Sequence, residues 1–236
     1  KVHTIMIDPG HGGADPGTVF GKTYEKDITL SVAQMLGEMI KKNLPDVKVH
    51  YTREKDVAVG LSDRTAKANR AKADLFLSIH VNAVAKGKTA PSGALTLVLG
   101  SNQTASDFEY AMRENSVIVY EEDYETKYQG FDPKDPESYI LFSLMQSAYG
   151  EQSLMMAGIL RLHYKKSTPM PGMDTRQMGL LVPRKLAMPG VLTAIGGLPN
   201  EKGRKGPTSK AGQQKKATAP VNALNEEKAR VEKRGR

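Results

Sequence analysis

The sequence predicts an α/β fold: a single domain in which helices cover both faces of a mostly parallel or mixed sheet of five to six strands. Two observations lead to this prediction. Short apolar runs alternate with stretches of helical periodicity from residue 4 onward, and a final apolar run follows Pro189-Gly190. Such alternation is typical of parallel strands joined by helices that bury their apolar sides against the sheet. The 236 residues suffice for one sizeable core.

The first half of the chain alternates strand and helix without interruption. Thr23 is a candidate N-cap that places Glu25 in the first turn of a helix, and His80 ends a buried strand. The expected strands are 4–7, 47–51 and 75–79, and the expected helices are 23–40 and 61–72.

The second half departs from this rhythm at an acidic, proline-containing stretch, residues 121–137. The expected strands are 94–99, 179–182 and 191–195, and the expected helices are 106–120, 138–148 and 152–164. We divide the chain into an α/β domain, 1–195, and a basic C-terminal segment, 196–236. That segment is expected to be a degenerate terminal helix divided at Pro220, or a partly disordered tail.

The composition excludes several classes of protein. There is no cysteine, which rules out disulfides and thiolate zinc sites. No apolar run is long enough to span a bilayer, so we expect no membrane insertion. The net charge is +8, but residues 196–236 hold 11 Lys and Arg against 4 Asp and Glu. That segment has no aromatic residue for base stacking, so we expect a solvated segment and no nucleic-acid partner.

Three residues from separate segments suggest a metal site. His11 follows a strand within a glycine-rich turn, Glu25 opens a helix whose dipole favours an ionised carboxylate, and His80 ends a second strand. Functional groups in open α/β sheets gather at the carboxyl ends of the strands. Two histidines and a glutamate are a ligand set of catalytic zinc. Taken singly, each of these residues is more simply read as structural.

Five motifs resemble, in order and spacing, the zinc-dependent N-acetylmuramoyl-L-alanine amidases of bacterial cell walls. They are DPGHGG at 8–13, YEKD at 24–27, YTR at 51–53, LSDR at 61–64 and ADLFLSIHVNA at 73–83, with weaker matches such as Glu114-Asn115 continuing to residue 195. The resemblance implies zinc bound by His11, Glu25 and His80. It also implies a hydrolase that cleaves the amide between N-acetylmuramic acid and L-alanine in peptidoglycan.

The same resemblance implies where and with what the protein acts. We expect a periplasmic or extracellular enzyme of the cell envelope, active in peptidoglycan catabolism and cell division, that binds muropeptides as a monomer. In some relatives an inserted helix covers the active site until an activator protein removes it. Residues 121–150 occupy the corresponding place in this sequence. Two interpretations of this segment are left undecided, an autoinhibitory element and a solvated loop. Asp8 and Asn82 are candidates to hydrogen-bond the ligand rings from behind.

One departure from the family concerns catalysis. Relatives end the last strand with a glutamate that acts as general base, and the matching residue here is Ala194. The catalytic residue is therefore unknown, and Glu201 is the nearest acidic substitute. Two functions stay open: an impaired amidase, and an inactive pseudo-amidase that binds peptidoglycan or regulates a partner.

Overall fold

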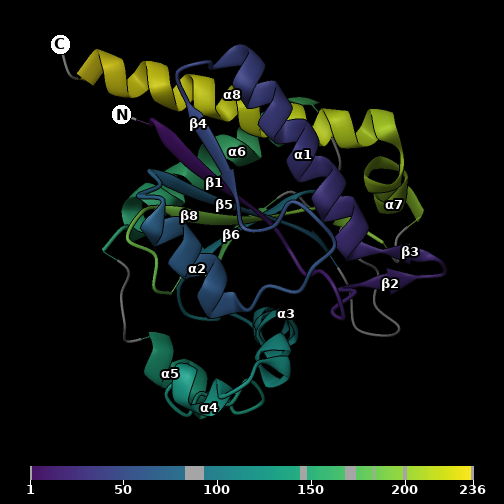
Figure 1. Cartoon of the computed structure of the whole chain (residues 1–236), viewed down its shortest axis with the longest axis vertical. Helices are drawn as coiled ribbons and strands as arrows, with labels where there is room; N and C mark the ends of the chain where they lie inside the picture. The colour runs from purple at the N-terminus through teal and green to yellow at the C-terminus, as the bar shows by residue number, and fades with distance from the viewer. Residues whose placement is uncertain are drawn as a thin grey trace.

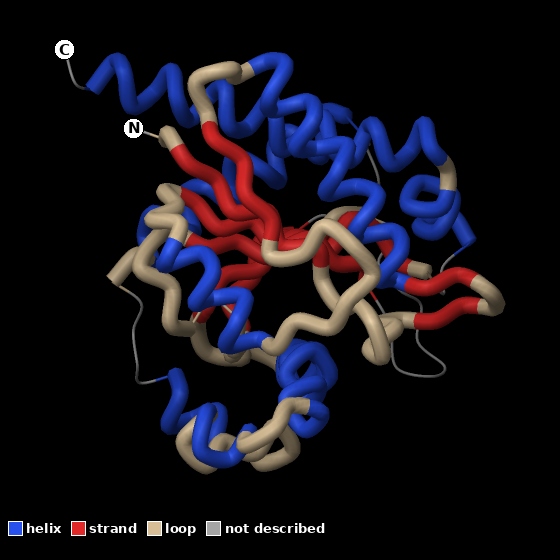
Figure 2. The backbone as a smooth tube through the Cα atoms, in the orientation of Figure 1, coloured by secondary structure: helices blue, strands red, loops and turns tan. Residues whose placement is uncertain are grey.

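A six-stranded mixed sheet crosses the middle of the computed structural model, which describes residues 2–82, 93–143, 148–167, 174–182, 184–198 and 201–234 (Figures 1 and 2). The strand order is β4-β1-β5-β8-β6-β7. The strands are β1 (Thr4–Pro9), β4 (Lys48–Tyr51), β5 (Leu75–Asn82), β6 (Leu95–Leu99), β7 (Asp174–Met178) and β8 (Gly190–Gly197). β6 pairs antiparallel with β8, and the other pairings are parallel. The predicted fold class is confirmed.

Helices cover both faces of this sheet. One core contains the apolar residues of α1 (Glu25–Asn43), α6 (Gly150–Ser167) and α8 (Lys210–Arg234). The opposite core contains those of α2 (Leu61–Arg70) and α3 (Ala105–Asn115). The short η1 (Ser116–Tyr120), α4 (Tyr124–Lys127) and α5 (Pro136–Ser143) follow α3 and lie on the same side as α2 in Figure 1. α7 (Glu201–Thr208) precedes α8, and a hairpin of β2 (Val19–Phe20) and β3 (Thr23–Tyr24) precedes α1.

The helix α1 follows its sequence pattern closely. Ile28, Val32, Leu36 and Ile40 recur every four residues and are all buried, which is the spacing of one helix face. The N-cap residue is Tyr24, whose side chain makes no capping hydrogen bond, so the predicted cap at Thr23 is wrong. Thr23 is instead part of β3, and α1 begins directly at the end of the hairpin.

The prediction of a strand at 179–182 is also wrong. The strand in this part of the chain is β7, which ends at Met178. β7 has the polar sequence DTRQM and occupies an edge of the sheet, where one side of a strand needs no partner. Its polarity hid it from a search for apolar runs. The apolar residues Leu180 and Val182 lie beyond the end of β7, outside the sheet, and line a pocket.

Within the C-terminal segment, α8 is continuous at Pro220, where the sequence predicted a break. Pro220 lies inside α8, and it removes the hydrogen bond that its N–H would give to the carbonyl of Lys216. Nevertheless Ala217, Val221 and Leu224 are buried in the same core as α1 and α6. This apolar packing stabilises the helix enough to offset the hydrogen bond lost at Pro220.

Candidate active site

The loop after β1 places His11 through an unusual backbone conformation. His11 has a φ of 60°, in the left-handed region that non-glycine residues rarely adopt, and Gly12 and Gly13 also have positive φ values. The chain therefore turns sharply at the carboxyl end of the strand. This turn brings the imidazole to the rim of the sheet.

Two buried guanidinium groups hold this loop by its carbonyl oxygens. Arg64 donates from Nη2 to the carbonyl of His11 at 2.8 Å and from Nη1 to that of Pro9 at 2.7 Å. Arg53 donates from Nε to Pro9 at 3.0 Å and from Nη2 to Gly10 at 2.9 Å. Both arginines are at most 3% exposed. They therefore fix a backbone conformation that would otherwise be costly.

Three side chains from three segments converge at this rim. Oε1 of Glu25 lies 3.3 Å from Nε2 of His11 and 3.3 Å from Nδ1 of His80. Both ring nitrogens are buried and lack a hydrogen-bond partner in the described part of the chain. Ligand atoms about 2.0–2.1 Å from a tetrahedral metal ion are separated by about 3.3 Å, so these spacings fit such an ion. The three residues form a group that could hold a metal, as the sequence predicted.

Neighbouring groups orient two of these ligand candidates. Nδ1 of His11 lies 2.7 Å from the Asp15 carboxylate, which leaves Nε2 free to face the site. Glu25 accepts a hydrogen bond at each oxygen, from the backbone N–H of Val81 at 2.7 Å and from that of Thr18 at 2.8 Å. Asp15 was not predicted as a site residue, although the sequence places it four residues after His11 within the same turn.

Asp8 and Asn82, predicted to support the ligand rings, are both buried beside them. The Asp8 carboxylate accepts hydrogen bonds from the hydroxyls of Thr52 and Ser78 and from Arg64. Burial alone would raise the pKa of Asp8, but Arg64 and the two hydroxyls bring it below its ordinary value. Nδ2 of Asn82 has no hydrogen-bond partner among the described residues. In this structure Asp8 joins β1 to its neighbours.

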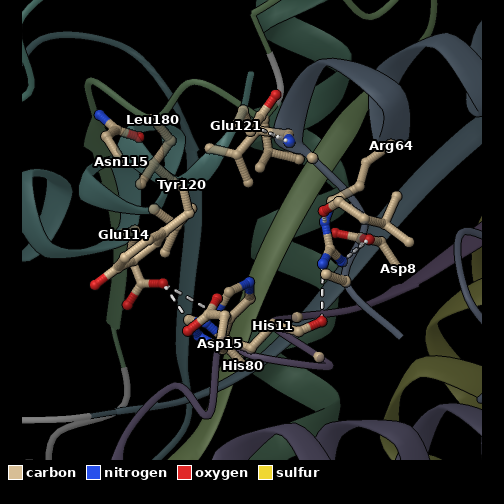
Figure 3. Close-up of a pocket in the computed structure, with 18 of the residues that line it drawn as sticks. Asp8, His11, Asp15, Arg64, His80, Glu114, Asn115, Tyr120, Glu121 and Leu180 are labelled. Carbon is tan, nitrogen blue, oxygen red and sulfur yellow. Dashed lines mark hydrogen bonds and ion pairs between the residues drawn. The ribbon is translucent and has the colours of Figure 1, made fainter. Parts of the chain in front are cut away.

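A fourth polar residue at the rim is Glu114, for which the sequence motifs predicted no role. Its Oε2 lies 3.1 Å from Nδ1 of His80 and 3.6 Å from Nε2 of His11, and it is buried without a hydrogen-bond partner among the described residues (Figure 3). It comes from the last turn of α3. No local pattern could have placed α3 over the rim, because that placement depends on the tertiary fold.

The pKa values of the ligand candidates respond to this concentration of carboxylates. Burial would lower the pKa of His11, but Glu25, Asp15 and Glu114 raise it well above its ordinary value. Burial is likewise outweighed at His80, where Glu114 and Glu25 raise the pKa to about 8. The carboxylates therefore favour positive charge at this point, whether protons or a metal ion supply it.

Two glycines permit the ligand side chains to approach each other. A Cβ on Gly10 would lie 2.5 Å from the ring of His80. A Cβ on Gly17 would lie 2.6 Å from the ring of His11 and 2.8 Å from Glu25. Any side chain at either position would push the ligand candidates apart.

A pocket of about 420 Å³ opens beside these residues. His11, His80 and Glu114 lie together at one part of its wall, while Arg64 and Asp8 lie to one side (Figure 3). Much of the remaining wall is apolar. A pocket with this lining is suited to an organic ligand that presents one polar group to the metal candidates.

Ala194 lies on the strand next to His80. The two residues are direct partners in the parallel pairing of β5 and β8, so their side chains point to the same face of the sheet. Leu192, two residues earlier on that face, lines the pocket. Glu201, the predicted substitute for a base, is 76% exposed and pairs with Lys205 at 3.6 Å.

Comparison with known proteins gives the family. The sequence model of the Amidase_3 family, described as N-acetylmuramoyl-L-alanine amidase, matches residues 5–226. The chain belongs to this amidase family. The family resemblance seen in the sequence motifs is thereby confirmed.

Individual relatives in this amidase family match to different extents. The amidase AmiC of Escherichia coli O6:H1 is 43% identical over 108 residues, which are 44% of this chain and 25% of AmiC. AmiA of Salmonella typhimurium is 26% identical over 221 residues, which are 93% of this chain and 74% of AmiA. The chain spans about a quarter to a third of the length of the first curated relatives that it matches.

A solved amidase structure has the same fold. The crystal structure of N-acetylmuramoyl-L-alanine amidase from Clostridium difficile 630 matches with a TM-score of 0.70 and 23% identity, over 95% of this chain and 96% of that one. Within the described residues, no helix combines the length and apolar character needed to cross a membrane.

Proposed function

We propose that this chain is the catalytic domain of a zinc-dependent peptidoglycan amidase whose turnover is impaired by the residue at position 194. The convergence of His11, Glu25 and His80 within a pocket carries the proposal. The substrate is the amide between N-acetylmuramic acid and the L-alanine of the stem peptide, as in the family. The cell envelope is the compartment where that substrate occurs.

Zinc suits this donor set. Two imidazole nitrogens and one carboxylate oxygen make a common set of zinc ligands in hydrolases, and the chain has no cysteine to compete. When bound, zinc polarises the amide carbonyl and lowers the pKa of water, so that water can attack at neutral pH. Asp15 would fix the ring of His11 and its tautomer, and the N–H groups of Val81 and Thr18 would keep Glu25 ionised and oriented.

The missing base is the main weakness of the site. A carboxylate on the face of β8 beside His80 would take a proton from the attacking water, and Ala194 has no group to do so. General-base assistance typically contributes about 10²–10⁴-fold. Glu114 is within the site and offers a carboxylate, whereas Glu201 is exposed in α7.

The Ala194 side chain also supports a second candidate function. A pseudo-amidase with an intact metal site and pocket would bind muropeptides, or regulate an active partner, without cleaving them. Activation by a partner protein and a monomeric state both stay predictions. Tyr128 and Phe131 are buried in the same core as α2, which supports residues 121–137 as a segment packed on the fold, and Glu121 of this segment lines the pocket.

Restoring the base separates the two functions. The zinc-loaded chain and its Ala194→Glu variant are incubated with purified peptidoglycan, and the release of stem peptides with a free L-alanine amino group is measured. We expect at least about a tenfold increase with Ala194→Glu, the low end of what a positioned base contributes. Ala194→Gln is the matched control, because glutamine has nearly the same size as glutamate but no carboxylate to accept a proton. Its rate should equal that of the unmodified chain.

Other results would change the assignment. Full activity of the unmodified chain would show that another base, with Glu114 first to test, serves the reaction. No activity in any variant that binds zinc would favour the binding module.

A further inference from the structure

The pocket has an exposed aromatic ring at its opening, that of Tyr120. This side chain lines the pocket on the side where Glu114 and Asn115 lie, and it is 83% exposed (Figure 3). The next most exposed large apolar side chain in the described part of the chain, Ile140, is 62% exposed. Among the described residues that line this pocket, Tyr120 is the one Phe, Tyr or Trp. A ring that lines the pocket and still faces solvent is open to a ligand.

The backbone that carries Tyr120 is anchored on both sides. Ile118, two residues earlier in η1, is fully buried in the core. Glu121, the next residue, donates its N–H to the carbonyl of Ile118 at 2.9 Å. Its carboxylate accepts hydrogen bonds from the N–H of Leu61 and the hydroxyl of Tyr128, both at 2.8 Å. The ring is therefore presented from a fixed support, and a ligand that contacts it orders only two side-chain torsions.

The size of the pocket separates the two arms of the substrate. One arm runs from the scissile amide through the lactyl group to the muramyl sugar, and the other is the stem peptide. The volume of about 420 Å³ is that of a site for a small molecule. A glycan strand continues in both directions from the muramyl residue, so it cannot enter such a pocket. The sugar therefore lies at the opening, where Tyr120 stands, and the peptide takes the interior.

A sugar ring suits the solvent-exposed position of Tyr120. One face of a pyranose consists mainly of C–H groups, while its hydroxyl groups point outward from the edge. The C–H face can lie flat on the negatively polarised face of an aromatic ring. The hydroxyl groups then stay in water, whereas in the apolar interior they would be buried without partners, which is costly.

We propose that Tyr120 is a specificity-determining residue that stacks on the sugar ring of the N-acetylmuramoyl group. The proposal rests on the proposed amidase function, because a muramyl substrate is what places a sugar beside the scissile amide. The contact lies away from the reacting amide, so it stabilises the bound substrate and the transition state equally. It therefore contributes to affinity and not to kcat.

Two ligands that differ in the sugar test the proposal. The probes are N-acetylmuramoyl-L-alanyl-D-isoglutamine and D-lactoyl-L-alanyl-D-isoglutamine, which keeps the amide and lacks the sugar ring. Their dissociation constants are measured by calorimetry with the zinc-loaded full chain, which has Ala194 at the position of the family's base and therefore leaves them intact.

The variant Tyr120→Ala should affect one ligand only. We expect it to weaken the muramyl ligand about fivefold and to leave the lactoyl ligand within about twofold. Tyr120→Phe keeps the ring and should bind both ligands as the unmodified chain does. Val119→Ala, at the neighbouring exposed position of η1, is the matched control and should change neither affinity. Zinc content and melting temperature should stay nearly unchanged, because both side chains are exposed.

A fluorescence measurement reports the contact directly. The chain contains no tryptophan, so Tyr120→Trp gives a protein whose tryptophan emission comes from this position alone. A sugar on the indole displaces water, so the emission should shift to shorter wavelength with the muramyl ligand and not with the lactoyl ligand. Val119→Trp should show no shift with either.

The remaining outcomes overturn the proposal. Equal weakening of both ligands in Tyr120→Ala would show that Tyr120 contacts the peptide arm or supports the pocket. Unchanged affinities and emission would show that the sugar lies elsewhere. Failure of the amidase assignment is seen separately, as the absence of stem-peptide release by Ala194→Glu. Release by that variant, with no effect of Tyr120→Ala on the muramyl ligand, would keep the amidase and remove the sugar contact.

Discussion

The loop that carries His11 and the helix α8 each contain a residue that disfavours the local backbone conformation. The two segments are stabilised against this cost in different ways. His11 has a positive φ, and the side chains of Arg53 and Arg64 donate hydrogen bonds to the carbonyl groups of Pro9, Gly10 and His11. Pro220 interrupts the hydrogen bonding of α8, which is held by apolar packing against α1 and α6.

This difference teaches which parts of the fold specify geometry. Directional hydrogen bonds from buried donors set the position of the candidate metal ligands to within a narrow range. Apolar packing tolerates a range of side chains, provided that volume and burial are kept. Substitutions in α8 should therefore change stability, whereas substitutions around the His11 loop should change both stability and metal binding.

The largest effect is expected from removing two ligands. The double variant His11→Ala with His80→Ala should reduce zinc from about one ion per chain to none after dialysis, because it removes both imidazole ligands and leaves only carboxylates. Elemental analysis measures it. His3→Ala with His50→Ala, which removes two histidines outside the site, is the control and should retain the ion. A full complement of zinc in the first variant would refute the ligand assignment.

Arg64→Met should have the next largest effect. It removes the ion pair with Asp8 at 2.7 Å and the bonds to the loop carbonyls, and it leaves a buried carboxylate without its cation. Breaking such a buried pair typically costs about 3–5 kcal/mol of the free energy of unfolding. Denaturant unfolding measures it, and zinc affinity should also fall. Arg70→Met, at an exposed position of α2, should change either quantity little.

Lys216→Met should raise the free energy of unfolding, whereas Arg64→Met at the His11 loop should lower it. Lys216 is 1% exposed in α8, with its Nζ 5.9 Å from the centre of the Tyr164 ring, and burial lowers the pKa of this lysine from 10.5 to about 8. A group that binds its proton less tightly when folded destabilises the folded state while it is charged. At pH 7 the expected gain from removing it is about 3 kcal/mol.

The pH dependence makes this prediction specific. The unfolded chain holds more protons than the folded one between pH 8 and 10.5, so the unmodified protein gains stability as pH rises through that window. The advantage of Lys216→Met should therefore shrink from pH 8 upward and vanish near pH 10.5. Lys215→Met, at the exposed neighbouring position, should show no such trend. An advantage that persists at high pH would point to packing in place of charge.

The smallest effect is expected for Pro220→Ala. It restores the N–H that can bond to the carbonyl of Lys216, and an interior proline costs about 3 kcal/mol. The ring is buried, so its loss removes contacts, and we expect a net gain of roughly 1 kcal/mol. Thermal unfolding measures it. A lower melting temperature would show that the ring, and not the helix, is needed there.

The sequence was most informative where chemistry depends on local turns. Glu25 begins α1, His11 follows the end of β1, and His80 lies two residues before the end of β5. The convergence of these residues follows from the parallel arrangement of β1 and β5. Strand β7 escaped prediction because an edge strand needs no apolar pattern.

The sequence was least informative where contacts join distant segments. Glu114 and Glu121 reach the pocket only because α3 and η1 pack over the rim, and no local spacing encodes that packing. The continuity of α8 through Pro220 was missed for the same reason, since tertiary contacts override helix propensity.

The capping of α2 has a consequence for folding. Leu61 and Ser62 donate their N–H groups to Glu121 and to the hydroxyl of Tyr128, residues about sixty positions later in the chain. The first turn of α2 therefore lacks these two protein acceptors, and water takes their place, until the later segment has docked. Opening of that segment would release both amides together, so their hydrogen exchange should report, as one cooperative unit, whether the wall of the pocket is closed.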